Sequence, residues 1–184
     1  MKQISHENAG AAFQKILTLS EEEAVRSLER FTRDHPAIMA FLGDRSSRDG
    51  VTREESTVWF ALAMGIEEAI RSAGFRCKGI TIDELETAEE QNTSWAEEEV
   101  PGTPDDTAAE PGATSAGDPR LAGYPQTPLL TCAMERLEEL EPSAVEPDET
   151  GVAPGLVVLK TLIDCLVHRA LPAGRGGPHH QGAK

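Results

Sequence analysis

Acidic residues are concentrated in one stretch of this sequence, and that stretch limits what the chain can fold into. Residues 80–150 contain 19 acidic and 2 basic residues, a net charge of −17, whereas the whole 184-residue chain carries −15. The flanking residues 1–79 and 151–184 carry −1 and +3. A block of like charges repels itself and is typical of an exposed arm. The sequence therefore predicts ordered segments on both sides of an acidic connection.

Residues 88–122 have the composition of a disordered linker. From Ala88 to Arg120, nine acidic residues accompany one base, and four prolines and three glycines recur. Trp95 and Val100 are the only large apolar side chains in that stretch. Little apolar surface is therefore available to offset the entropy lost on ordering. We expect a long, acidic, disordered Pro/Gly linker over residues 88–122.

Residues 1–87 predict an N-terminal helical half. Ser20 and Glu23 have the spacing of a capping box, in which each side chain satisfies a free backbone amide at the start of a helix. A second helical pattern runs over residues 53–73, with apolar residues along one face. Residues 75–82 are expected to form a short strand or to stay irregular. Because only 4% of the residues are aromatic, the core must be mainly aliphatic.

Residues 123–172 predict a C-terminal helical hairpin that docks on the N-terminal half. Its second helix, residues 155–170, is apolar around much of its circumference, which indicates a central, buried position. About 50 residues make a poor independent core, so docking is expected. Residues 173–184 are Gly-rich and are expected to form a mobile tail.

These patterns together predict an all-α fold: a small bundle of about five helices in two hairpin-like halves. The two halves follow the same plan, and Ile66-Glu67 in one long helix resembles Ile163-Asp164 in the other. An internal repeat with approximate two-fold symmetry is one interpretation. The other is that any two amphipathic hairpins look alike.

Three residues are candidate metal ligands. Asp164 and His168 are four positions apart, so they share one helix face, and His35 stands beside Pro36 at a helix break. The simpler interpretations are a helix-end His paired with Asp164, and a surface capping residue at His35. The adjacent acids Glu67 and Glu68 are interpreted as a solvated helix face.

Several function classes lack their chemistry in this sequence. No phosphate-binding glycine loop, nucleophile elbow or zinc-protease motif occurs, so the chain is interpreted as leaning away from an enzyme, with no cofactor. The negative charge disfavours nucleic acid as a partner. No apolar run is long enough to predict a membrane segment. Three widely spaced cysteines without a CxxC motif predict neither a disulfide framework nor a thiolate zinc site, and a cytoplasmic location fits best.

Three aromatic residues are the candidate partner-binding positions. Trp59 and Phe60 are adjacent on one helix, so they cannot both face the same core directly. Trp95 is flanked by acidic residues, which is typical of a short docking motif; the alternative is a Trp that packs back on the domain. The favoured function is a non-enzymatic cytoplasmic protein-interaction or accessory protein. The alternatives are a helical metal- or small-molecule-binding protein that uses Asp164 and His168, and an acidic mimic that occupies a nucleic-acid-binding partner.

Overall fold

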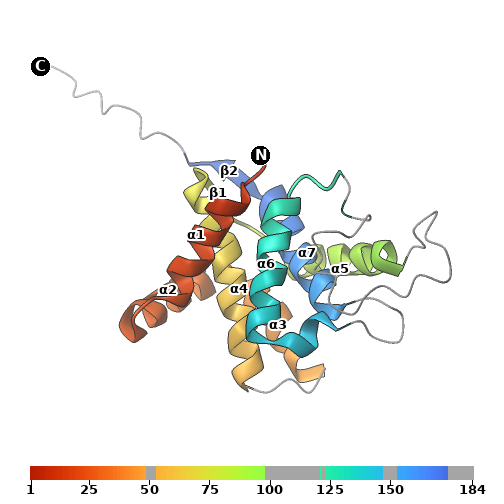
Figure 1. Ribbon diagram of the computed structural model, residues 1–184, viewed down its shortest axis with the longest axis horizontal. Helices are drawn as coiled ribbons and strands as arrows, with labels where there is room; N and C mark the ends of the chain where they lie inside the picture. The colour runs from red at the N-terminus through yellow and green to blue at the C-terminus, as the bar shows by residue number, and fades with distance from the viewer. Residues whose placement is uncertain (49–52, 98–120, 122, 147–152, 174–184) are drawn as a thin grey trace, which may run out of the picture.

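The chain folds mainly into α-helices, as the sequence predicts. The computed structural model describes residues 1–48, 53–97, 121, 123–146 and 153–173 (Figure 1). Within these ranges there are seven α-helices, where about five were expected: α1 (His6–Leu17), α2 (Glu21–Asp34), α3 (Pro36–Arg48), α4 (Arg53–Ser72), α5 (Ile82–Glu97), α6 (Thr127–Leu140) and α7 (Pro154–His168). A short 3₁₀ helix, η3 (Pro142–Val145), follows α6. None of the described helices has both the length and the apolar character needed to span a bilayer.

Side-chain caps explain where the first helices begin. Ser5 caps α1, because its Oγ accepts a hydrogen bond from the Asn8 amide at 3.3 Å. Ser20 and Glu23 form the expected capping box at the start of α2, and the Glu23 carboxylate accepts the Ser20 amide at 3.0 Å. The hydrogen bonds from Ser20 also lower the pKa of Glu23. α2 ends at Asp34, directly before His35-Pro36.

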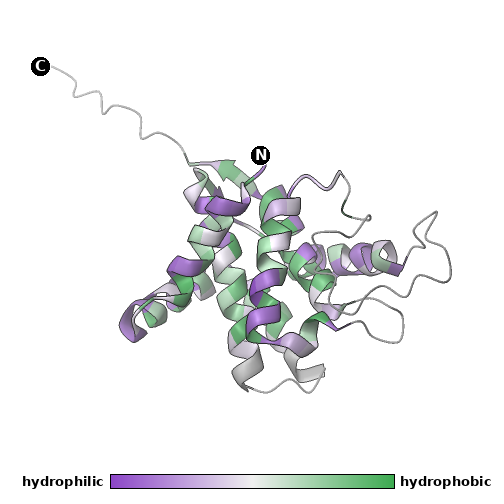
Figure 2. Cartoon of the chain, viewed as in Figure 1, coloured by the Kyte–Doolittle hydropathy of each residue, from purple (hydrophilic) through white to green (hydrophobic). Residues whose placement is uncertain are grey.

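The buried core lies where α1, α4, α6 and α7 meet. In Figure 1, α4 and α6 run side by side, with α1 beside both of them and α7 behind α6. α1 approaches α4 closely because residue 65 is glycine: a Cβ at Gly65 would overlap the ring of Phe13, which is 1% exposed. Figure 2 shows hydrophobic green concentrated in this central region and much hydrophilic purple on α2 and α5, which reach outward on opposite sides.

The central position predicted for the last helix is observed. Every residue of α7 from Gly155 to Leu166 is buried, apart from Asp164. This helix packs against α4, α5 and α6. Apart from Val157, its buried apolar residues belong to the same core cluster as those of α1 and α4, so residues from both sides of the acidic stretch share one core.

A two-stranded antiparallel sheet joins the end of α4 to the end of α7. β1 (Phe75–Cys77) pairs with β2 (Ala170–Pro172), with Cys77 opposite Ala170. The amide of Ala173 extends the pairing by donating to the Gly74 carbonyl at 2.9 Å. A strand was one of the two alternatives expected for residues 75–82. The helix expected to reach residue 170 instead ends at His168.

The prediction of a disordered linker over residues 88–122 is wrong for residues 88–97, which belong to α5, and for Leu121, which is buried in the core. This helix packs against α7 and α3, and one stripe of its buried and half-buried side chains recurs at helical spacing: Leu85, Ala88, Asn92 and Ala96. The acidic residues lie mainly on the other faces of the helix, so a high acidic content is compatible with one narrow packing stripe. The rest of the expected linker, residues 98–120 and 122, and the tail from residue 174 lie outside the described residues.

Candidate functional site

A buried lysine on α7 is the centre of a polar network that joins α7 to α5 and to the segment leading into α6. Lys160 is only 9% exposed. Its Nζ donates to Oδ1 of Asn92 on α5 at 2.7 Å and to Oδ2 of Asp164, one turn along α7, at 2.7 Å. The ammonium also lies 5.0 Å from the ring centre of Trp95 and 4.7 Å from that of Tyr124. An isolated buried ammonium is costly, and here hydrogen bonds and aromatic faces replace its water.

Asp164 is held in place by three donors. Besides Lys160, the Tyr124 hydroxyl donates to its Oδ1 at 2.7 Å, and the Asn92 amide donates to its Oδ2 at 3.3 Å. The same Asn92 amide group donates to Thr161 Oγ1 at 3.1 Å. Burial and the neighbouring Asp164 both raise the pKa of Tyr124, so the hydroxyl keeps its proton and acts as a donor. We call the five hydrogen-bonded residues the Lys160 network: Lys160, Asn92, Asp164, Tyr124 and Thr161.

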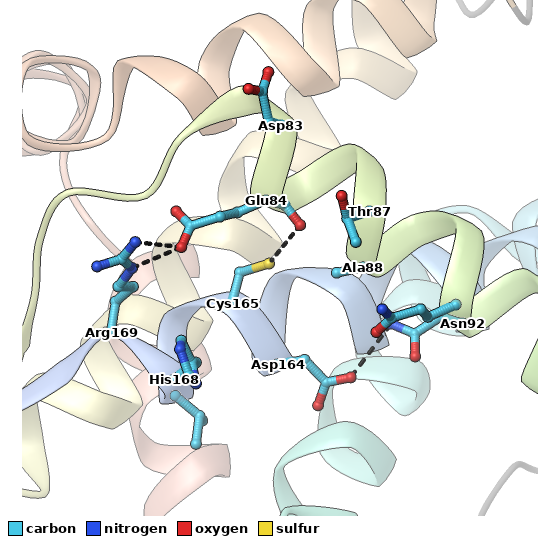
Figure 3. Close-up of a pocket in the computed structure, with 11 residues that line it drawn as sticks. Asp83, Glu84, Thr87, Ala88, Asn92, Asp164, Cys165, His168 and Arg169 are labelled. Carbon is cyan, nitrogen blue, oxygen red and sulfur yellow. Dashed lines mark hydrogen bonds and ion pairs between the residues drawn. The ribbon is translucent and has the colours of Figure 1, made fainter.

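Asn92 and Asp164 of the Lys160 network line one end of a pocket between α5 and α7. The pocket has a volume of about 650 Å³, within the range of small-molecule sites. Figure 3 shows Asp164 and Asn92 at one end and Glu84 and Arg169 at the other. The other lining residues are Asp83, Thr87, Ala88 and Gln91 on α5, and Cys165, Val167 and His168 on α7.

Glu84 and Arg169 close the opposite end of the pocket as an ion pair. Arg169 Nε donates to Glu84 Oε1 at 2.9 Å. Glu84 also accepts the Thr81 amide at 2.9 Å, while its own amide donates to Thr81 Oγ1 at 3.3 Å, which is a capping box at the start of α5. The backbone hydrogen bond from Thr81, followed by the one from Arg169, lowers the pKa of Glu84. This carboxylate is therefore charged and already paired.

Cys165 contributes an unactivated thiol to the pocket wall. Its Sγ lies 3.7 Å from the Glu84 carbonyl oxygen. Burial, together with the charges of Asp164 and Glu84, raises the pKa of this thiol to about 11. A thiol with that pKa is almost entirely protonated at neutral pH, which is unsuited to a nucleophile.

The structure places two of the three candidate metal ligands in this pocket. Asp164 and His168 both line it, as their spacing on one helix face predicts. The described partners of Asp164 are Lys160, Tyr124 and Asn92, so the interpretation that pairs Asp164 with His168 is not what is observed. In the described ranges, no group of three clustered His, Cys, Asp or Glu ligands includes Asp164, His168 or His35.

His35 lies elsewhere and is buried, which corrects its interpretation as a surface residue. It is 2% exposed, and its ring centre lies 4.9 Å from that of Phe31. Its Nε2 is 4.0 Å from Oε1 of Glu67 on α4, and among the described residues its Nδ1 has no hydrogen-bond partner. Burial lowers the pKa of His35, so its neutral form is favoured. Packing of α2 and α3 against α4 covers a helix junction that looks exposed in the sequence.

Glu67 and Glu68 are also buried, so the prediction of a solvated face is wrong. Arg30 of α2 donates to Glu67 at 2.8 Å, and Lys15 of α1 donates to Glu68 at 2.7 Å. Burial raises the pKa of Glu67. For Glu68 burial acts in the same direction, but hydrogen bonds from Lys15 and Arg71 outweigh it and lower the pKa. Both acids tie neighbouring helices to α4.

The three aromatic candidates are half-buried. Trp59 and Phe60 both pack against the core cluster from α4. Trp95 lies on α5, contacts the core and places its ring beside Lys160. It matches the alternative interpretation of a Trp that packs back on the domain. Sequence reasoning missed Lys160, Asn92 and Tyr124, although Lys160 interrupts an otherwise apolar helix and is therefore a visible signal.

Comparison with known proteins adds no family. No family model, no curated protein and no solved structure matches this chain.

Proposed function

We propose that this protein is a non-enzymatic binding protein whose α5–α7 pocket takes a small, positively charged polar molecule. This is the small-molecule alternative raised by Asp164 and His168 in the sequence. The observation that supports it best is Asp164: a carboxylate fixed by three donors whose side chain is still 34% exposed at a pocket wall. A binding site needs such a positioned polar group in a concave surface.

The charges around the pocket favour a cation. Three carboxylates line it, from Asp83, Glu84 and Asp164, against the guanidinium of Arg169 and the imidazole of His168. The guanidinium is paired with Glu84 and the Asp164 carboxylate with the Lys160 ammonium, so among the described groups Asp83 leaves the pocket lining with an unpaired negative charge. A carboxylate has about four acceptor sites, and the described donors to Asp164 use three. An ammonium group of a ligand therefore has an acceptor at Asp164, while Ala88 and Val167 provide apolar contacts for a short carbon chain.

Titration with three probes of similar size and different charge tests this proposal. Butylammonium, butanol and butyrate have similar shapes but carry positive, zero and negative charge. In ¹H–¹⁵N correlation spectra, we expect butylammonium to shift α5 and α7 signals with a Kd of about a millimolar, which suits so small a ligand. The other two probes should bind at least about fivefold more weakly, since butanol donates only a neutral hydrogen bond to Asp164 and butyrate is repelled by it.

Two variants separate the pocket from the rest of the acidic surface. Asp164→Asn keeps the shape of the side chain but removes its charge, and it should abolish the preference for butylammonium. Glu86→Gln is the matched control, because Glu86 is exposed on α5 and does not line the pocket. Equal binding of butyrate and butylammonium, or an unchanged preference in Asp164→Asn, would refute the proposal.

The protein-interaction function and the cytoplasmic location stay predictions. The free, buried state of all three cysteines is compatible with a reducing compartment. The half-buried packing of Trp59, Phe60 and Trp95 leaves less aromatic surface for a partner than the sequence suggests. The acidic-mimic alternative depends largely on residues 98–120, outside the described ranges.

A further inference from the structure

Three metal-ligating side chains meet outside the α5–α7 pocket, where α1 begins beside α6. His6 is the first residue of α1, while Cys132 and Glu135 are three positions apart on one face of α6. One ligand atom of each lies within 4.8 Å of the other two. His6 Nε2 and Glu135 Oε2 are 2.8 Å apart. This group shares no residue with the α5–α7 pocket.

The backbone around the group holds these residues in place. Two residues before His6, the amide of Ile4 donates to Oε1 of the buried Gln126, just before α6, at 3.1 Å. Ile4 itself is 2% exposed, so the segment leading into α1 is anchored to the core. One turn later, Gly10 faces Cys132: a Cβ there would be in ordinary contact with the sulfur, at 3.9 Å. The start of α1 is therefore fixed against α6.

We propose that His6, Cys132 and Glu135 bind a zinc ion. Imidazole nitrogen, thiolate sulfur and carboxylate oxygen are the three donor types that Zn²⁺ takes in proteins. Zinc bonds of about 2.0–2.3 Å in a tetrahedron place ligand atoms about 3.3–3.8 Å apart. The observed group reaches that spacing by side-chain rotation, as the His6–Glu135 hydrogen bond opens and the metal takes its place.

The surroundings suit an open site that exchanges metal with solvent. The side chains of His6 and Glu135 are 54% and 40% exposed, whereas Cys132 is 1% exposed. Two ligands therefore face water and one faces the core, and water completes the fourth position. The neighbouring base Arg136 is paired with Glu139 at 2.5 Å, which offsets part of its repulsion of a cation.

Zinc binding breaks one covalent bond to a hydrogen atom. The S–H bond of Cys132 breaks, its proton passes to water, and bonds from zinc to sulfur, nitrogen and oxygen form without electron transfer. Zinc binding must therefore release a proton at neutral pH, and this release is measurable by calorimetry in two buffers.

Metal titration of the full chain tests the site. Zinc is titrated in competition with a chromophoric chelator, and cobalt(II) serves as a spectroscopic probe. Every sample carries His179→Ala and His180→Ala, because adjacent histidines bind stray metal. We expect one zinc ion per chain and, with cobalt, the near-ultraviolet charge-transfer band of a thiolate ligand.

Single substitutions then assign the ligands. His6→Ala is the variant least able to disturb the fold, since the side chain is exposed, and it should weaken zinc binding at least about tenfold. Cys132→Ala should remove the cobalt–thiolate band, and Cys77→Ala, at another buried free cysteine, should leave it unchanged. Circular dichroism confirms that each variant is folded.

Three results would overturn the site. They are the absence of stoichiometric zinc, zinc binding that His6→Ala and Glu135→Gln leave unchanged, and cobalt binding without a thiolate band. The butylammonium titration is independent of all three, because none of these substitutions touches the α5–α7 pocket.

Discussion

Replacing Lys160 with methionine is the sharpest test of how the Lys160 network works. Methionine keeps most of the length and the apolar stem of the side chain, so contacts beneath Trp95 and Tyr124 can persist. The substitution removes the ammonium and therefore both short hydrogen bonds, to Asn92 and to Asp164. It leaves a carboxylate whose remaining donors are Tyr124 and Asn92.

The expected cost follows from the burial of the two partners. Removing one member of a fully buried ion pair costs about 3–5 kcal/mol. The Lys160 side chain is 11% exposed, but that of Asp164 is 34% exposed, so water partly solvates the carboxylate left behind. We therefore expect Lys160→Met to lower the free energy of unfolding by about 2–3 kcal/mol, with a fall in Tm of roughly 5–10 °C.

Urea denaturation followed by far-ultraviolet circular dichroism measures this cost. A double-mutant cycle with Asp164→Asn isolates the pair, and a coupling energy of about 1–2 kcal/mol is expected. Lys78→Met is the control: Lys78 is exposed, so its replacement should change stability by less than about 0.5 kcal/mol. A loss from Lys160→Met as small as that of Lys78→Met, or one that is the same with and without Asp164→Asn, would refute the reasoning.

Two further predictions concern the packing of α1 against α4 and the buried histidine. Gly65→Ala should lower the free energy of unfolding by about 1–3 kcal/mol in urea titrations, because the new methyl group overlaps the buried ring of Phe13. Gly43→Ala, where a Cβ meets nothing within 4 Å, should instead stabilise by up to about 1 kcal/mol; the same sign for both would contradict the packing argument. Burial places the pKa of His35 below its ordinary 6.5, so its contribution to stability is complete above that pH and is lost as the pH falls towards the folded-state pKa. Glu67, with its raised pKa, contributes in the opposite direction, so the comparison of wild type with His35→Gln in urea at several pH values isolates the histidine; equal slopes below about pH 6.5 would show that His35 is not responsible.

Much of the helical structure is predictable from the sequence because its signals are local. The capping box at Ser20 and the apolar periodicity of α4 and α7 need only neighbouring residues to be recognised. α5 is not predicted from the sequence, because the acidic composition of the 35 residues 88–122 obscures the local helix signal at residue 81. Thr81 and Glu84 form a capping box there, which the sequence displays as plainly as the one at Ser20.

The candidate site was only partly predictable because its members come from distant segments. Asp164 and His168 share a face through helical spacing alone. The pairing of Lys160 with Asn92 joins residues 68 positions apart, and that of Tyr124 with Asp164 joins residues 40 apart. Such contacts depend on how helices pack, which a single sequence does not display. The burial of His35 and Glu68 was missed for the same reason.

The burial of α7 also affects the order in which the protein can fold during synthesis. This helix is translated after α4, α5 and α6, the three helices whose apolar faces it covers. Until residues 154–168 leave the ribosome, the buried faces of α5 and α6 lack a main packing partner. The nascent chain therefore keeps apolar surface exposed until late in translation, a state in which growing chains are prone to aggregate. The acidic residues that lie between α4 and α7 in sequence carry enough like charge to limit self-association during that interval.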